Sequence, residues 1–485
     1  MASESRFLGG YIGRILRVDL SKNVSHSIPI RPGFVLKYVG GRGWGAGFVW
    51  EEIPPKVDPL GPKNKLYIMT GPLTGTHALC STKTSLSAIS PATGYYGDSN
   101  VGGFFGPMLK RAGFDGIIIE GRAKKPSYIW VEDGEVQIRD ASDYWGMTPL
   151  NAERAVRADN GNNFFHAISI GPAGENLVKF ACITEKHGRQ AGRCGMGAVM
   201  GSKNLKLIAL RGAYDIPIAD PEKLDQLYRE AKEYVLRHPL LDLWRRQGTM
   251  QVVDWANANA CLPTRNFIGA VYDRSDGICG DAMEKRIKIG DVSCFECPIS
   301  CGNRCRVDGF GSNATVVGPE YETAALLGSN CGLSSIEELV QANYLCDELG
   351  IDTISAGNVA AFAMECLERG IITREVLGGI DLRFGNSEAL FRFLEMVAYR
   401  KGIGDLFAEG VKTASKTIGK GSEGFAMHVK GLEISGYEHR AAPAMALSYA
   451  TADIGAHHNR SWAIVYDIKT GRGRYGEDKA RKVIS

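Results

Sequence analysis

The sequence predicts an α+β fold in which a strand-rich first part is followed by a helical second part. From residue 8 to about 212, short β-branched runs alternate with Gly, Pro and Asn turns. After residue 220 the apolar residues recur at a spacing near 3.6, which is typical of helices. A charged stretch near residues 211–222 separates the two patterns and marks the clearest domain boundary.

The first part contains several candidate strands. The pair Asp133-Gly134 lies inside "VEDGEV" and suits the positive φ values of a tight hairpin turn. The strand-like runs are "RILRVDL", "KLYIMTG", "TSLSAIS", "DGIIIEG", "SYIWVEDGEVQIRD" and "FHAISIG".

The second part contains helix-like segments such as "SIEELVQANYLCDELG" and "SEALFRFLEMVAYRKGIGDLFAEGVKTA". Ser335 followed by Glu338 fits a capping box, so we expect a helix to start there.

Length and charge narrow the function classes. A chain of 485 residues is long enough for two or three domains. The 57 basic and 54 acidic residues are interspersed, which argues against a nucleic-acid partner. The N-terminal segment lacks signal-peptide features and no apolar run is long enough to span a bilayer, so we expect a cytoplasmic protein with no membrane partner.

The segment "CFECPISCGNRC" concentrates four thiols in residues 294–305. Cys294, Cys297 and Cys301 have C-x2-C-x3-C spacing, which is typical of the loop that wraps a cubane iron–sulfur cluster. Structural zinc, which favours two separated ligand pairs, and inert thiols are the alternatives. The remaining cysteines are mostly single residues in apolar segments and are expected to be buried thiols, such as Cys182, Cys331, Cys346 and Cys366.

Glycine is unusually frequent, with 60 of 485 residues against a usual share of ~7%, and four stretches of the first part are especially rich in it. These are "YVGGRGWGAG", "SNVGGFFGP", "GPAGEN" and "GRQAGRCGMGAVMGSKN". Each one alone is as well explained by turns. Together they favour a large, phosphate-bearing ligand. A dinucleotide fingerprint is disfavoured because Ala46 stands where "GGRGWGAG" would need its third glycine.

Eight segments in order resemble the tungsten-containing aldehyde ferredoxin oxidoreductase family. They are "GGYIGRILRVDL", "YVGGRGWGA", "TGPLTGT", "SNVGGFFGPMLKRAGFDGIIIEG", "AGRCGMGAVMGSKNLK", "CFECPISCGN", "GPEYET" and "CDELGIDTIS". The resemblance implies a β-rich domain at residues 1–212 that binds a bis-pterin tungsten centre. It also implies a helical domain with the iron–sulfur loop at 213–420 and an incomplete second helical domain at 421–485.

The resemblance further implies the cofactors and their ligands. Cys294, Cys297 and Cys301 are the expected ligands of a [4Fe–4S] cluster. A tungsten or molybdenum bis-pterin is expected, with Mg²⁺ bridging its phosphates as a further possibility. Its expected contacts are Lys83, Asn100, Gly102, Arg189, Gln190, Gly192, Arg193, Asp347, Ile351 and Asp352. Arginines pair with phosphate, and carboxylates accept hydrogen bonds from pterin N–H groups.

Three departures from the family pattern stand out. Where family members usually have a basic residue that contacts the pterin region, this chain has Lys83, which keeps the positive charge but lacks the bidentate fork of an arginine. Gln341 replaces an acidic residue that holds a metal between subunits in some members, so we expect that intersubunit site to be absent. Family chains also continue beyond "KARKVIS", and we expect the sequence to be a fragment whose fourth cluster cysteine lies farther along. Cys305 is then a neighbour of the cluster loop.

The activity implied by the resemblance is the oxidation of an aldehyde to a carboxylate, with electrons leaving through the cluster to ferredoxin or an iron–sulfur subunit. Glu320 and His458 are the expected catalytic residues, with Glu322 and His457 as their less favoured neighbours. A homodimer is a further possibility. Two alternatives stay open: an aromatic acyl-CoA reductase subunit of the benzoyl-CoA type, and a non-catalytic iron–sulfur or zinc module that relays electrons or binds a partner.

Overall fold

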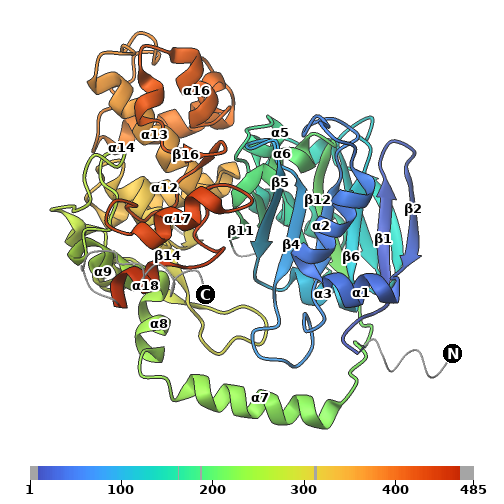
Figure 1. Ribbon diagram of the computed structural model, residues 1–485. Coiled ribbons are helices and arrows are strands. Elements are labelled where there is room, and N and C mark those ends of the chain that lie inside the picture. Colours follow the sequence, from blue (N-terminus) through green and yellow to red (C-terminus); the bar gives the residue numbers. More distant parts are fainter. Residues whose placement is uncertain (1–8, 162, 186–187, 311–313, 470–485) are drawn as a thin grey trace. The chain divides into compact units, whose positions relative to one another are not determined.

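The computed structural model describes residues 9–161, 163–185, 188–310 and 314–469, which fold into two compact units (Figure 1). The first unit comprises residues 1–245, 291–302 and 347–352. The second comprises residues 246–290, 303–346 and 353–485. The chain therefore leaves the first unit after residue 245 and returns to it twice. The expected mixed fold, with a β-rich first part and helices after it, is confirmed. The division into three domains stays a prediction.

The first unit contains two six-stranded sheets, and every strand-like run of its sequence lies in one of them. The order of the first sheet is β2-β1-β6-β3-β4-β5, where β1 and β6 are parallel and all other neighbours are antiparallel. Its strands are β1 (Arg14–Asp19), β2 (Val24–Pro29), β3 (Leu66–Thr70), β4 (Thr84–Ile89), β5 (Tyr96–Val101) and β6 (Gly116–Glu120).

The second sheet repeats the topology of the first. Its order is β8-β7-β12-β9-β10-β11, with β7 and β12 as its parallel pair. Its strands are β7 (Ser127–Glu132), β8 (Glu135–Asp140), β9 (His166–Ser169), β10 (Ile183–Glu185), β11 (Arg189–Ala191) and β12 (Leu205–Arg211). The edge strands β5 and β11 are equivalent in the two sheets, and they contact each other.

Eight α-helices are described between residues 32 and 247. They are α1 (Pro32–Tyr38), α2 (Gly41–Glu52), α3 (Phe105–Arg111), α4 (Pro149–Asp159), α5 (Pro172–Glu175), α6 (Met196–Gly201), α7 (Pro221–Leu236) and α8 (Leu241–Gln247). Helix α2 lies on β3 and β4, with Trp44 and Phe48 in a core that also holds Tyr67. A Cβ atom on Gly45 would lie 2.3 Å from the Ser87 hydroxyl of β4, so this glycine-rich stretch serves close helix–sheet packing.

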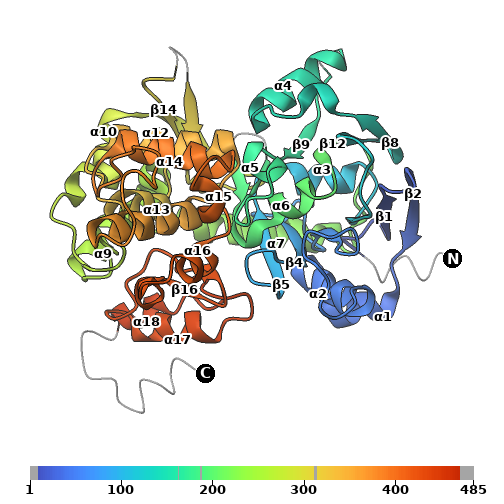
Figure 2. The same ribbon diagram turned by 90° about the horizontal axis from the view of Figure 1, so that it is seen from above.

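Helices α3 and α6 each follow one of the two edge strands, and each contacts both sheets. Helix α3 packs on β9 and β12 as well as on β3, and α6 packs on β3 and β4 as well as on β12. Figure 2 shows both helices within the first unit. The loops that enter these helices, residues 102–104 and 192–195, therefore lie where the two sheets approach each other.

The second unit is mainly helical. Its elements are α9 (Val252–Ala258), α10 (Gly280–Arg286), α11 (Tyr321–Thr323), a π-helical turn (Ala324–Ser329), α12 (Ile336–Leu349), α13 (Thr353–Glu368), α14 (Ser387–Ala398), α15 (Gly404–Phe407), α16 (Val411–Ile418), α17 (Pro443–Thr451) and α18 (Ile464–Lys469). Strand β13 (Lys288–Val292) precedes the cysteine loop, and β14 (Gly302–Arg306) pairs with β15 (Thr315–Val317) after it. A short hairpin joins β16 (His428–Val429) to β17 (Leu432–Glu433).

Two local predictions can be compared with the structure. Asp133 and Gly134 adopt φ values of 46° and 87° between β7 and β8, which confirms the hairpin turn. Helix α12 begins directly after Ser335, as predicted, and the Ser335 hydroxyl accepts a hydrogen bond from the Glu337 N–H at 3.2 Å. The Ser335 hydroxyl in turn donates to the Glu337 carboxylate, whereas the Glu338 carboxylate accepts from the Ser387 hydroxyl. The predicted capping partner is therefore wrong by one position.

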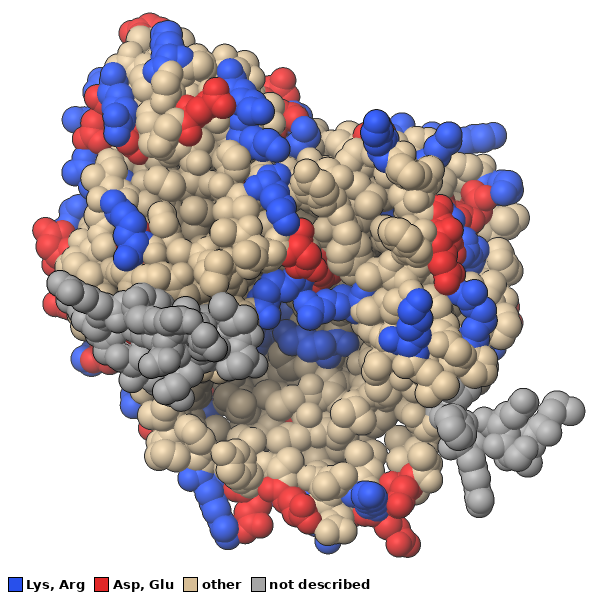
Figure 3. All heavy atoms as spheres, viewed as in Figure 1, with Lys and Arg blue, Asp and Glu red and all other residues tan. Residues whose placement is uncertain are grey.

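Charged residues of both signs occur together on the face drawn in Figure 3, where many Lys and Arg side chains lie beside Asp and Glu. This agrees with the mixed charge pattern of the sequence. Among the described helices, none combines the length and the apolar character that crossing a membrane requires.

Candidate functional site

The structure places all predicted cofactor residues in the first unit. They come from four segments: residues 83–102, residues 189–193, the cysteine loop 294–301 and residues 347–352. We call this group the cofactor cluster. Its centre is the contact between edge strands β5 and β11, because Asn100 lies in β5 and Arg189 begins β11.

The segment 347–352 reaches the cofactor cluster through main-chain and side-chain bonds. Ile351 forms an isolated β-bridge with Ala181, and the Asp352 N–H donates to the Phe180 carbonyl at 3.2 Å. Gln190 donates to Asp347 at 3.0 Å. This side-chain bond joins two predicted cofactor residues that are 157 positions apart.

Arg193 and Asp352 form a buried ion pair within the cofactor cluster. Their side chains are each about 5% exposed, and Arg193 Nε lies 3.2 Å from Asp352 Oδ2. A Cβ atom on Gly192 would lie 3.4 Å from Asp352 Oδ1, so the glycine leaves room beside the carboxylate. A carboxylate has about four acceptor sites, so an aspartate is a suitable residue type to meet the N–H donors of a pterin.

The cysteine loop packs against the segment that follows β5. The Phe295 N–H donates to the Gly103 carbonyl at 3.2 Å. A Cβ atom on Gly102 would lie 2.9 Å from the Cys294 sulfur and 3.8 Å from Lys83 Nζ. Gly102, a predicted pterin contact, therefore lies close to the predicted cluster ligand Cys294 and to the Lys83 ammonium. A larger residue at this position would displace the Cys294 thiol.

Two further side chains fix the loops of the cofactor cluster. Arg245 donates from Nε and Nη2 to the Pro298 carbonyl at 3.3 and 2.9 Å, which holds the middle of the cysteine loop. The buried Glu185 carboxylate accepts from the Phe104 N–H at 2.9 Å, which holds the turn after β5. Sequence reasoning missed both, because neither belongs to a recognisable motif.

The three loop cysteines are half-buried, which suits thiolates that must reach a bulky group. Within the described residues, no three His, Cys, Asp or Glu side chains converge on a position for one metal ion. A cubane cluster requires no such convergence, because each of its thiolates binds a different iron. The half-buried thiols and the Gly102 cradle beside Cys294 therefore fit an iron–sulfur cluster. The two arginines, Arg189 and Arg193, and the carboxylates of Asp347 and Asp352 are residue types that fit a phosphate-bearing pterin.

Cys80 is a fourth thiol at this loop that sequence reasoning missed. It lies between β3 and β4, and its N–H donates to the Glu296 carbonyl at 2.8 Å. Partial burial, followed by the neighbouring Cys297, raises the pKa of the Cys80 thiol to about 12. No motif could have revealed it, because the contact joins positions far apart in the sequence.

Cys305 lies in a different environment. It is fully buried in β14, where it faces Val316 of β15. Burial raises the pKa of its thiol to about 12. The four single cysteines expected to be buried thiols, Cys182, Cys331, Cys346 and Cys366, are buried and free of disulfides.

The second unit holds both predicted catalytic residues, in separate environments. Glu320 precedes α11, is half-buried, and accepts a hydrogen bond from the Thr249 hydroxyl. His458 Nδ1 lies 3.1 Å from Glu322 Oε1 and 3.1 Å from the Ser435 hydroxyl. The described contacts thus pair the predicted histidine with the neighbouring glutamate, Glu322.

Glu322 is held in place by the main chain. Its Oε2 accepts from the Gly436 N–H at 2.6 Å, and a Cβ atom on Gly436 would lie 3.0 Å from that oxygen. His457, the other candidate, is buried, and its Nδ1 accepts from the Asn459 N–H at 3.0 Å. This bond turns Nδ1 of His457 toward its own loop. Among the candidate catalytic residues, Glu322 and His458 are therefore the two that the described contacts hold together.

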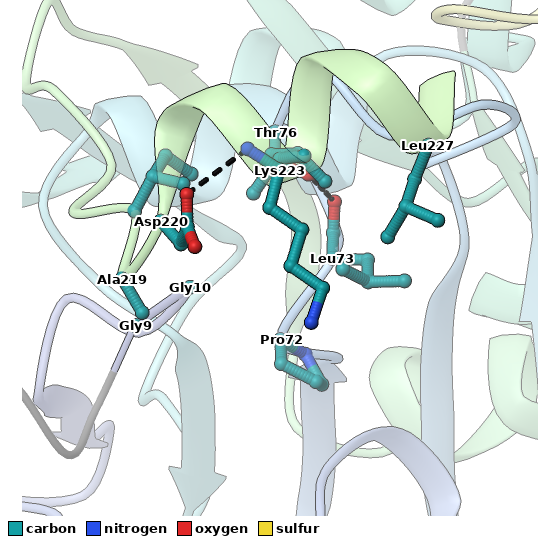
Figure 4. A pocket seen from close by; sticks show the side chains of 11 residues that line it. Gly9, Gly10, Pro72, Leu73, Thr76, Ala219, Asp220, Lys223 and Leu227 are labelled. Carbon is teal, nitrogen blue, oxygen red and sulfur yellow. Dashed lines mark hydrogen bonds between the residues drawn. The ribbon is translucent and has the colours of Figure 1, made fainter. Parts of the chain in front are cut away.

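A small pocket lies beside the loop that carries Cys80. It is lined by Gly9, Gly10, Pro72, Leu73 and Thr76 together with residues around the start of α7, and Figure 4 shows the Lys223 chain extending toward Pro72. Its volume is about 210 Å³. Ligand pockets usually measure roughly 300–1,000 Å³, so this pocket is too small for a pterin cofactor.

Residues 15–212 match the family model described as aldehyde ferredoxin oxidoreductase, N-terminal domain. Residues 226–485 match the model for domains 2 and 3 of the same enzyme. The chain therefore belongs to the aldehyde ferredoxin oxidoreductase family, as the sequence motifs predicted, and is an oxidoreductase.

Individual relatives agree with this assignment. The tungsten-containing aldehyde ferredoxin oxidoreductase of Thermococcus kodakarensis is 41% identical over 461 residues, which is 95% of this chain and 75% of the relative. The aliphatic sulfonate oxidoreductase, WOR-like subunit, of Pyrococcus furiosus is 34% identical, and the match covers 95% of this chain and 77% of that relative. Among solved structures, the active site complex BamBC of benzoyl coenzyme A reductase with 1,5-dienoyl-CoA matches at a TM-score of 0.83 and 29% identity. That match covers 92% of this chain and 70% of the other.

Proposed function

We propose that the chain oxidises an aldehyde to a carboxylate with a tungsten or molybdenum bis-pterin held by the first unit, and passes the electrons through a [4Fe–4S] cluster to ferredoxin. The observation that supports this most is the cofactor cluster. It brings the cysteine loop, the Arg193–Asp352 pair and the Gln190–Asp347 pair together in one unit. The relatives at 41% identity carry the matching name.

The residues of the first unit hold the cofactors in this proposal. Cys294, Cys297 and Cys301 bind iron, and Arg189 and Arg193 neutralise pterin phosphates. When bound, the pterin-held metal supplies a two-electron oxidant and the cluster passes the electrons on singly. Asn100, Gly102, Gly192 and Ile351 present the main chain to the pterin, and Mg²⁺ between the phosphates completes the expected set.

The residues of the second unit handle the proton. Oxidation of an aldehyde and a water molecule to a carboxylate releases two electrons and three protons, so a base is needed. With its Nδ1 proton directed to Glu322, His458 has Nε2 as its basic nitrogen. The Glu322 carboxylate stabilises the imidazolium that forms when Nε2 takes a proton. We propose this role for Glu322 ahead of Glu320, because Glu320 is engaged by Thr249.

A second candidate function is the reduction of an aromatic acyl-CoA, which the likeness to benzoyl coenzyme A reductase favours. The higher identity to the aldehyde enzymes places it second. The two candidate functions differ in their substrate, an aldehyde in one and an aromatic acyl-CoA in the other.

The test is a metal, pterin and activity analysis of the protein purified anaerobically from its natural source. We expect iron and tungsten (or molybdenum) near about 4:1, pterin fluorescence after oxidation, and aldehyde-dependent reduction of a viologen dye. Zinc without iron or pterin would contradict the proposal. Dienoyl-CoA-dependent dye reduction without aldehyde activity would favour the second candidate.

A further inference from the structure

The second unit contains a pocket that the proposed function does not use. Its volume is about 390 Å³, within the roughly 300–1,000 Å³ of ordinary ligand pockets. The residues that are described as lining it all belong to the second unit, and no predicted cofactor or catalytic residue is among them. Four arginines line this pocket, which we call the arginine pocket: Arg265, Arg274, Arg374 and Arg383.

The carboxylates of the arginine pocket neutralise only half of its positive charge. Asp381 lies 2.6 Å from Arg374 Nη2 and 2.5 Å from Arg383 Nη2. Glu368 lies 2.5 Å from Arg265 Nη2. The four guanidinium groups and two carboxylates that line the pocket therefore leave two positive charges. A network of ion pairs alone would balance its charges, so this excess favours an anionic ligand.

The arginines keep donors for such a ligand. A guanidinium has five N–H donors, so an arginine that is paired with one carboxylate still has donors to offer. Arg274 is the least engaged of the four. Its Nη2 lies 3.5 Å from the Gly332 carbonyl and its Nε lies 4.0 Å from Asp273, which are long distances for these interactions. The planar fork of a guanidinium matches the oxygen atoms of a phosphate.

The loop that carries Arg265 has an unusual backbone. Thr264 and Gly269 close it with two main-chain hydrogen bonds of 3.0 Å. Between them Arg265, Asn266 and Phe267 have φ values of 49°, 51° and 61°, which a residue with a Cβ atom adopts only at an energetic cost. Backbone strain of this kind is concentrated at functional sites. Here it fixes the segment from which one of the four arginines reaches the pocket.

One side of the arginine pocket is apolar. It is formed by the buried Met364 and by the half-buried Leu367 and Phe384. The guanidinium carbon of Arg265 lies 4.9 Å from the centre of the Phe384 ring, which is a cation–π contact. The cationic and apolar parts of the pocket therefore adjoin. A ligand that fits both parts carries an anionic group next to an apolar or aromatic body.

We propose that the arginine pocket binds a small phosphate monoester whose organic part packs on Leu367 and Phe384. A phosphate monoester carries a charge of about −1.5 to −2 at neutral pH, which matches the two uncompensated positive charges. A monocarboxylate would balance only one of them. Inorganic phosphate would leave the apolar side of the pocket unused. This inference goes beyond the proposed oxidoreductase function and uses none of its residues.

The test is isothermal titration calorimetry of the full chain with phenyl phosphate at neutral pH and low ionic strength. Benzoate has the same ring with one carboxylate, glutarate carries two carboxylates, and inorganic phosphate lacks the ring. Arg274→Gln and Arg383→Gln each remove one positive charge from the pocket. Arg286→Gln is the matched control, because Arg286 lies in the same unit but pairs with Glu337 and does not line the pocket.

We expect phenyl phosphate to bind at a single site. Arg274→Gln and Arg383→Gln should each weaken the binding at least about tenfold, because a hydrogen bond to a charged group is lost. Arg286→Gln should bind like the wild type. Asp381→Asn removes a competing carboxylate and should tighten the binding several-fold, which a damaged fold would not do. Affinity should fall as salt is added.

The absence of saturable phenyl phosphate binding by the wild-type chain would overturn the inference. Unchanged affinity in both arginine variants would also overturn it, because phenyl phosphate would then bind elsewhere, and unchanged affinity in Asp381→Asn would contradict the charge argument. Benzoate or glutarate binding as tightly as phenyl phosphate would refute the choice of a phosphate. Equally tight binding of inorganic phosphate would refute the role of the apolar side. Circular dichroism checks that each variant is folded.

Discussion

The two units of the chain contribute different chemistry. The first unit holds every predicted cofactor contact, and these are mostly thiols, arginines, aspartates and glycines that bind a preformed group. The second unit holds Glu320, Glu322 and His458, the residues that we propose as candidates for proton exchange. Because the two groups of residues lie in different units, we expect that substitutions can alter cofactor binding and proton transfer separately. A variant in the first unit should change what is bound, and a variant in the second should change the rate alone.

The largest effect is expected from Cys297→Ser in the first unit. A hydroxyl is a poor ligand for iron in place of a thiolate, so the paramagnetic signal of the cluster should disappear and dye reduction should fall to background. Iron analysis and spectroscopy of the purified variant check this. A cluster signal of wild-type intensity would show that the loop does not bind it.

Glu322→Gln in the second unit comes next. If Glu322 supports His458 as a base, aldehyde oxidation should fall about 10²–10⁴-fold, because general base catalysis contributes that much. Iron, tungsten and pterin contents should stay at the wild-type level. Steady-state kinetics with a viologen dye measure the effect.

Glu320→Gln is the matched control for that experiment, because it lies two residues away and is held by Thr249. We expect its rate to stay within a few-fold of wild type. If Glu320→Gln is instead the slower variant, the roles of the two glutamates are reversed.

Asp352→Asn breaks the buried pair with Arg193 in the first unit. Leaving one charge of a buried pair without its partner costs about 3–5 kcal/mol, so thermal stability and pterin content should both decrease. Differential scanning calorimetry and pterin fluorescence measure the two. Asp308→Asn, at an exposed carboxylate of the second unit, is the control and should leave both unchanged.

Lys83→Arg should have the smallest effect. Lys83 is exposed beside Gly102, and an arginine there would restore a bidentate donor for the pterin region. We expect a few-fold slower loss of pterin during dialysis and an unchanged rate. Faster pterin loss than in the wild type would show that the shorter ammonium is required.

Much of the first unit could be predicted from local sequence, since strands and turns follow local patterns. Asp133-Gly134 gave the hairpin because the turn demands positive φ at adjacent positions. The equal order of the two sheets could not be predicted, because strand order depends on long-range pairing and the sequence shows no repeat. Ser335 predicted the start of α12, but whether Glu337 or Glu338 bonds back to it depends on side-chain packing.

The candidate site divides in the same way. Cys294, Cys297 and Cys301 form a short motif with recognisable chemistry, so they could be named from sequence. The position of Cys80 beside the cysteine loop and the pairing of Glu322 with His458 depend on contacts between distant segments. Neither position carries a local signal, so only the folded chain reveals them.

The discontinuity of the first unit affects how the protein is made. Gln190 leaves the ribosome 157 positions before its partner Asp347, and the cysteine loop is synthesised between them. At about 5–20 residues per second, this interval lasts roughly 8–30 seconds. During that time the two sheets can form while the cofactor cluster still lacks its last acidic segment. If the proposed metal centre binds at this cluster, its insertion would have to await the emergence of residue 352, and the nascent chain would need an apo state that persists until then.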